Sequence, residues 1–115
     1  MALTDAGKAV MLNALGDVVG MSSLHTADPG TDGSNEVSGG SPAYAKKAIT
    51  WNTATAGDLD TSNTPIFDVP ASTTVTHLGL WSGDGATFYG GVALSASETF
   101  AAQGTYTLSD ADVNL

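Results

Sequence analysis

Hydrophobic residues near the start of the chain recur with helical spacing. Within "LTDAGKAVMLNALGDVVG", Met11, Leu15 and Val18 stand at positions i, i+4 and i+7, and Thr4 is placed to cap the free amides at the start. The pattern predicts a helix over residues 4–19 with one apolar face. That face requires a partner, which is either the chain's own sheet or a neighbouring subunit.

From residue 21 onward the pattern changes to short segments rich in threonine, valine, aromatic residues and glycine, separated by turn-forming clusters. Such segments are typical of antiparallel strands, which we expect near residues 21–27, 44–52, 64–69, 74–82, 86–94 and 104–109. The predicted fold is mainly β, an antiparallel β-sandwich-like domain with one N-terminal α-helix. The length of 115 residues indicates a single domain over 1–115, with the β body spanning about 21–115.

The segments "TTVTHLGLW" and "ATFYGGVAL" are predicted to form a hairpin, because Asp84 and Gly85 between them suit a tight reversal. Gly90 and Gly91 indicate a bulge or a close backbone approach in its second strand. Strict alternation divides the first strand into two faces, with Val75, His77, Gly79 and Trp81 on one and Thr76, Leu78 and Leu80 on the other. Both faces carry apolar groups, so each needs a covering layer.

Two further segments are predicted from the positions of proline and of the last apolar residues. Pro65 and Pro70 bracket "IFDV", which favours a short edge strand. The chain ends on the apolar pair Val113 and Leu115, and such a tail is expected to be tied to the body.

Charge and composition exclude several classes of protein. Lys8, Lys46 and Lys47 are the only basic residues, and 12 acidic residues bring the net charge to -9, which disfavours nucleic-acid binding. The absence of cysteine removes disulfides, thiolate metal sites and cysteine nucleophiles. The start lacks the pattern of a secretion signal and no apolar run approaches the ~20 residues of a membrane-spanning helix, so we expect a soluble protein made in the cytoplasm.

The polar stretch "SLHTADPGTDGSNEVSGGSPAYAK", residues 23–46, carries a candidate calcium site. Asp28, Asp32, Asn35 and Glu36 offer the oxygen ligands that calcium prefers. Their spacing does not follow an EF-hand loop, because Gly30 and Gly39 occupy the third and twelfth positions counted from Asp28. Aspartate, asparagine, glycine and proline are also the residues that turns demand, so the preferred interpretation is a surface connection ordered, if at all, by neighbours.

Candidate catalytic residues are few. His25 and His77 are the only histidines, and without a G-x-S-x-G motif the abundant serines do not indicate a Ser-His-Asp arrangement. Among the acidic residues, Asp58, Asp60, Asp68 and Glu98 could supply a carboxylate pair for hydrolysis, but acidic side chains in turn-rich chains are normally solvated. We therefore expect no enzymatic activity.

Aromatic residues supply a candidate ligand surface. Trp51, Trp81, Phe88 and Tyr89 could stack against sugar rings, with Trp51, Trp81 and Tyr89 as the ligand-facing members. The competing interpretation is that most of these residues belong to the core, because the chain has few aromatic residues with which to build one.

The order of several segments resembles small virion structural proteins of tailed bacteriophages and prophages, especially those of actinobacteria. The segments that carry this resemblance are "SLHTADPG", "NEVSGGSPAYA", the stretch from "FDVPA" to "TTVTHLGLW", and "ETFAAQGTYTL", and it covers nearly the whole chain. Such proteins are labelled tail fibre, minor tail or head decoration proteins.

The resemblance implies a non-enzymatic virion component that assembles through contacts with phage capsid or tail proteins, without cofactor or metal. Without a fibrous repeat, the chain is expected to be a compact module rather than a long shaft. Its apolar surfaces suggest self-association, as a trimer or a higher ring. The alternative hypothesis is a host-receptor or carbohydrate-binding module of a tail appendage.

Overall fold

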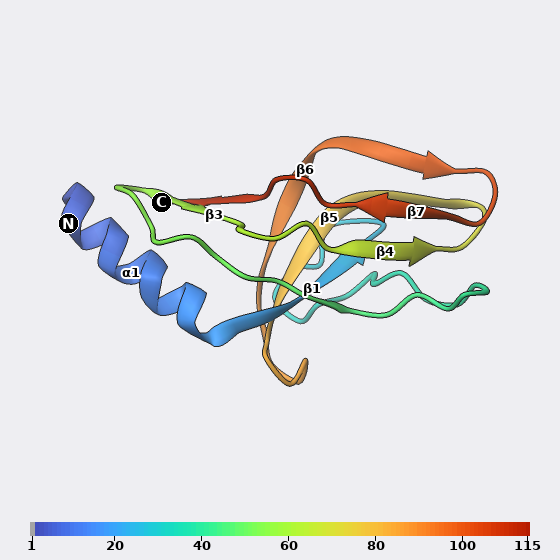
Figure 1. The fold of residues 1–115 in the computed structure, drawn as a ribbon, viewed down its shortest axis with the longest axis horizontal. Coiled ribbons are helices and arrows are strands. Elements are labelled where there is room, and N and C mark those ends of the chain that lie inside the picture. Colours follow the sequence, from blue (N-terminus) through green and yellow to red (C-terminus); the bar gives the residue numbers. More distant parts are fainter. Residues whose placement is uncertain (1) are drawn as a thin grey trace.

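The computed structural model describes residues 2–115 and shows a mainly antiparallel β protein with one helix at its N-terminal side (Figure 1). In chain order the elements are α1 (Asp5–Val18), β1 (Val19–His25), β2 (Lys47–Ala48), β3 (Asp58–Asp60), β4 (Ile66–Val69), β5 (Thr73–Ser82), β6 (Phe88–Phe100), β7 (Gly104–Thr107) and β8 (Asp112–Asn114). The predicted fold class is confirmed. No helix within residues 2–115 combines the length and apolar character needed to cross a bilayer.

The strands form three antiparallel sheets. The largest has the order β2-β1-β5-β6, while β3 pairs with β8 and β4 pairs with β7. The main core lies between the large sheet and the β4–β7 pair, where Leu24 and Leu78 from the former meet Phe67 and Val69 from the latter, all fully buried. Two packed layers account for the sandwich-like character expected from the sequence.

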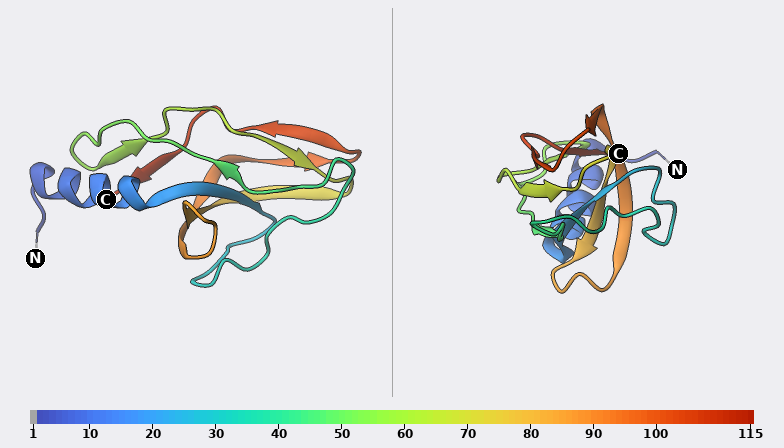
Figure 2. Two further views of the ribbon diagram at one scale, coloured as in Figure 1. Left: turned by 60° about the horizontal axis from the view of Figure 1, so that its bottom comes forward. Right: turned by 90° about the vertical axis from the view of Figure 1, so that its right-hand side faces the viewer.

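The helix extends from one end of the β body, alongside β3 and β8 (Figure 2). It begins as predicted, because the Thr4 Oγ1 accepts a hydrogen bond from the Gly7 amide at 3.1 Å. The chain covers only part of the predicted apolar face: Leu15 packs against the main core and the neighbouring Leu12 is buried against Leu59 of β3, whereas Met11 and Val18 stay exposed. The helix then passes directly into β1, since Val19 both caps α1 and begins the strand.

The β5–β6 hairpin is confirmed, with its reversal at Asp84 and Gly85. The Asp84 carboxylate accepts a hydrogen bond from the Ala86 amide at 3.0 Å, and Gly85 takes a positive φ of 73°. Both predictions for the glycines of β6 also hold. The register shifts between Leu80 and Trp81, and a Cβ at Gly91 would collide with Pro29 of the loop that covers this strand.

The division of β5 into two faces is wrong at Val75. This residue belongs to the same core cluster as Leu78 and Leu80, although strict alternation assigns it to the opposite face. The ladder is irregular at the same point, because β5 advances two residues from Val75 to His77 while β6 moves five, from Glu98 to Ala93. Such an irregularity cannot be read from a period of two.

Other boundaries differ from the predicted ones. The segment 44–52 contributes only the two-residue strand β2, while β6 continues to Phe100, well beyond the predicted end at residue 94. The short strands β3 and β8 were not predicted, because three-residue strands leave little local pattern. They tie down the apolar tail as expected, with Val113 opposite Leu59 and the Leu115 amide bonded to the Gly57 carbonyl at 2.9 Å. Pro65 and Pro70 flank β4, as predicted.

The loop of residues 26–36 covers the face of the large sheet that lies opposite the main core. Pro29 is buried against Gly91, and a Cβ at Gly33 would collide with Trp81. The loop closes back on β1 where the Val37 amide bonds to the Leu24 carbonyl at 3.0 Å. The expectation that this connection is ordered by neighbours is therefore wrong, because contacts within the chain order it.

Candidate functional site

Three carboxylates converge where β3 and β8 pair. Within residues 2–115, Asp58, Asp60 and Asp112 form a group whose candidate ligand oxygens all lie within 4.8 Å of one another. The alternation of β3 places Asp58 and Asp60 on one side and Leu59 on the other, where it is buried under the helix. The ladder then sets Asp112 directly opposite Asp60. The packing of Leu59 thus determines which way the acidic side chains point.

The carboxylates perturb one another. A hydrogen bond with Asp60, partial desolvation and the charges of Asp60, Asp110 and Asp58 raise the pKa of Asp112 to about 6. Desolvation and the charge of Asp60 also raise the pKa of Asp58. The Asp58 Oδ1 is a buried oxygen without a hydrogen-bond partner in the part of the chain that the structure describes. Like charges on directly opposed residues destabilise a strand pair, so the cluster holds unrelieved negative potential.

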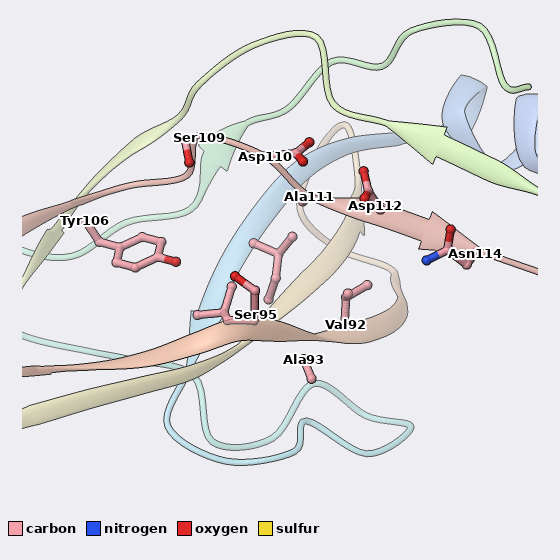
Figure 3. A pocket seen from close by; sticks show the side chains of 11 residues that line it. Val92, Ala93, Ser95, Tyr106, Ser109, Asp110, Ala111, Asp112 and Asn114 are labelled. Carbon is pink, nitrogen blue, oxygen red and sulfur yellow. The ribbon is translucent and has the colours of Figure 1, made fainter.

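A pocket of about 340 Å³ lies beside this cluster, between β6 and the segment that leads into β8 (Figure 3). Its lining combines apolar side chains with polar ones. Asp110 and Asp112 lie on the C-terminal segment, Val92 and Ser95 lie across from them on β6, and the Tyr106 ring closes one end with its hydroxyl turned toward the pocket. This volume is in the range of sites that hold small molecules or single side chains of a partner.

The residues of the candidate calcium site are used for local bonds instead. The Asp28 Oδ1 accepts from the Gly30 amide at 2.9 Å, whereas the two Glu36 oxygens accept from the Tyr44 hydroxyl at 2.8 Å and the Lys46 ammonium at 2.9 Å. Hydrogen bonds from Ser34 occupy Asp32 and lower its pKa. Asn35 donates to the Asp28 carbonyl at 3.1 Å. The structure does not bring Asp28, Asp32 and Glu36 together as a three-carboxylate group in the described residues.

His25 lies in a buried chain of hydrogen bonds. Its Nδ1 is 2.7 Å from the Ser34 carbonyl oxygen, which can only accept, so Nδ1 carries the proton and Nε2 accepts from the Ser23 hydroxyl at 2.6 Å. The Ser23 Oγ in turn accepts from the Trp81 Nε1 at 2.7 Å. Burial lowers the pKa of His25, which favours the neutral ring that these bonds require.

The pairing of a serine with a histidine resembles half of a catalytic triad, but the surroundings are structural. Ser23 and His25 are both 0% exposed, so no substrate reaches them. A carbonyl rather than a carboxylate orients the ring. His77 bonds to the adjacent Thr76 hydroxyl at 2.8 Å. The pair Ser23–His25 fastens the loop of residues 26–36 to β1.

The aromatic residues proposed to face a ligand are largely engaged within the molecule. The Trp51 indole donates to the Val19 carbonyl at 3.1 Å. One face of Trp81 holds the Lys46 ammonium, 4.1 Å from the ring centroid, and its edge meets Phe88 at a centroid distance of 5.0 Å. Tyr89 is 44% exposed. The two tryptophans thus contribute to packing and loop attachment.

The residue pattern predicts two members of the carboxylate cluster but not the third, Asp112. Asp58 and Asp60 were candidates, but the structure brings them to Asp112 and not to Asp68 or Glu98. A signal was present in the spacing, because Asp110-x-Asp112 repeats the Asp58-x-Asp60 pattern and alternation sets each pair on one side of a strand. That signal becomes useful only when the pairing of β3 with β8 is known.

Comparison with known proteins gives one family. The model of a family described as podophage GP4 fiber I protein gp80 matches residues 21–115. The match includes the carboxylate cluster and the pocket, and it begins two residues into β1, so α1 lies outside it. A search of curated proteins finds no match.

Replacement of Ser23 by alanine is expected to destabilise the fold. The Ser23→Ala variant leaves both the Trp81 indole and the His25 Nε2 without their partner, so the free energy of unfolding should fall by about 1–3 kcal/mol. Urea denaturation followed by tryptophan fluorescence measures this change. Ser38→Ala, at an exposed position without a side-chain hydrogen bond among the described residues, is the matched control. Equal stabilities of the two variants would contradict the structural role of the pair.

The Asp112 pKa makes stability depend on pH. Because this pKa is raised from 3.8 to about 6 in the folded state, the native protein binds more protons than the unfolded chain between these values. The contribution of Asp112 to the free energy of unfolding is therefore highest at low pH and falls as the pH rises through about 6. Asp112→Asn should flatten this decline between pH 4 and pH 7 in urea titrations, whereas Asp17→Asn on α1 should retain it. Parallel pH profiles for all three proteins would contradict the coupling.

Proposed function

The chain belongs to the family of the podophage GP4 fiber I protein gp80, and from this membership we propose that it is a non-enzymatic structural component of a phage tail fibre. It works by contacts with other virion proteins. The single observation that carries this proposal is the family match over residues 21–115, which spans nearly all of the β body. We favour the tail over the capsid surface because the family description names a fibre protein.

The absence of catalysis is part of the proposal, and two features support it. The Ser23–His25 pair is buried and bonded to the Ser34 carbonyl. The family description also names a fibre protein rather than an enzyme.

The helix offers a surface for self-association. Leu12 and Leu15 face the body, yet Val10, Met11 and Val18 are 70%, 51% and 46% exposed. Met11 and Val18, spaced by seven residues, lie on one side of the helix with Val10 beside them. Val10, Met11 and Val18 are uncharged, but Asp17 lies seven residues after Val10 on the same side of the helix, so one carboxylate borders the proposed contact. We include a closed homo-oligomer, such as a trimer or ring, in the proposed assembly.

Labelling of virions tests the location. Gold-labelled antibodies against the purified protein should mark tail appendages in electron micrographs of the phage particles, and peptides of the chain should appear in mass spectra of purified virions. Labelling confined to the capsid would favour a decoration role over a fibre role. Absence of the protein from virions would overturn the structural function.

Charged substitutions on the helix test self-association. The double variant Met11→Glu and Val18→Glu should shift the protein from an oligomer to a monomer in size-exclusion chromatography with light scattering, because two new charges on each copy would face one another. Ile66→Glu is the matched control, since Ile66 is a comparably exposed apolar residue on β4, 56% exposed. If the unaltered chain is monomeric at all concentrations, or if the control dissociates equally, the helix is not the contact.

A further inference from the structure

The pocket beside β8 has two kinds of wall. Leu78, Val92 and Leu94 supply apolar side chains, and Asp110 and Asp112 supply carboxylates. Figure 3 shows Asp110, Asp112 and Val92 around one space, with the Tyr106 ring at one end. An elongated group with an apolar stem and a charged end fits such a combination, because its stem can lie on the aliphatic wall while its head reaches the carboxylates.

The charge that Asp110 and Asp112 place on the pocket is negative, and no basic side chain among residues 2–115 forms an ion pair with it. The only salt bridge found among residues 2–115 joins Lys46 to Glu36, on the loop side of the molecule. Lys8 passes close to Gly57, next to the cluster, but forms no ion pair with its carboxylates in the described residues. Asp58 and Asp60 reinforce the negative potential at Asp112. The group that complements this site is therefore a cation.

We propose that this pocket binds a lysine or arginine side chain from a basic segment of a neighbouring virion protein. The inference rests on the proposed function, since it takes the occupant to be a protein within the virion. A second copy of this chain is a poor donor: it has three basic residues and no arginine, and Lys46 is already paired. The partner is thus a different, more basic protein, and the acidic surface attracts it before contact.

Titration with short peptides tests the pocket on the full chain. The probe is acetyl-Gly-Lys-Gly-amide, and its matched control is the same peptide with norleucine, which keeps the aliphatic stem and lacks the ammonium. Amide chemical shifts of the ¹⁵N-labelled protein at neutral pH and low salt should change at residues 92–95 and 106–114 with the lysine peptide alone. Asp110→Asn should weaken this binding about fivefold, as expected for loss of one partly exposed charge contact. Asp17→Asn, which removes the same charge from α1, should leave it unchanged.

Other outcomes overturn the proposal. No shifts with the lysine peptide, or equal shifts with norleucine, would show that the pocket does not select a basic side chain. Shifts produced by calcium chloride alone would assign the carboxylates to a divalent cation. A loss of binding in Asp17→Asn equal to that in Asp110→Asn would reduce the effect to net charge. None of these results affects labelling of the virion, so failure of the pocket and failure of the fibre assignment are distinguishable.

Discussion

The structure depends on keeping both faces of the β1–β5 ladder away from water. Phe67 and Val69 of β4 cover one face, and the loop of residues 26–36 covers the other, where Gly33 lies against Trp81 of β5. Beneath the loop, the Ser23 and His25 side chains of β1 leave no room for a side chain at Gly79, because a Cβ there would collide with both. A small sheet thus obtains two hydrophobic covers from a chain of 115 residues, one from strands and one from an irregular segment.

The parts of the fold that the sequence predicts are those with a local signal. The spacing of Met11, Leu15 and Val18 defines the helix, and the reversal at Asp84 defines the hairpin, because neighbouring residues specify both. The strands β3 and β8 are different, since they pair residues more than fifty positions apart and have only Leu59 and Val113 as apolar residues. The carboxylate cluster is a product of that pairing, so prediction recovered Asp58 and Asp60 but not Asp112. The hydrogen-bonded role of the loop was missed for the same reason.

The negative charge is distributed with two different consequences. On the loop, the Lys46 ammonium neutralises Glu36 and the Tyr44 hydroxyl donates a hydrogen bond to it, so these contacts order the segment. At β8, Asp112 faces other carboxylates, and the result is an unsatisfied field beside a pocket. Stability alone would favour removal of this repulsion, because like charges on opposed strands weaken the pair. A basic side chain of a partner would relieve this repulsion on assembly. The repulsion would therefore favour the assembled state of the proposed fibre.

The absence of a linker between α1 and β1 has a mechanical consequence. Val19 ends the helix and begins the strand, and Gly20 packs so closely on Gly83 that a Cβ there would come within 2.9 Å of the opposing backbone. The helix and the large sheet are therefore expected to move as one rigid unit. A load applied through α1 passes along β1 as shear on its hydrogen bonds to β5, which share the force among several rungs instead of opening one at a time.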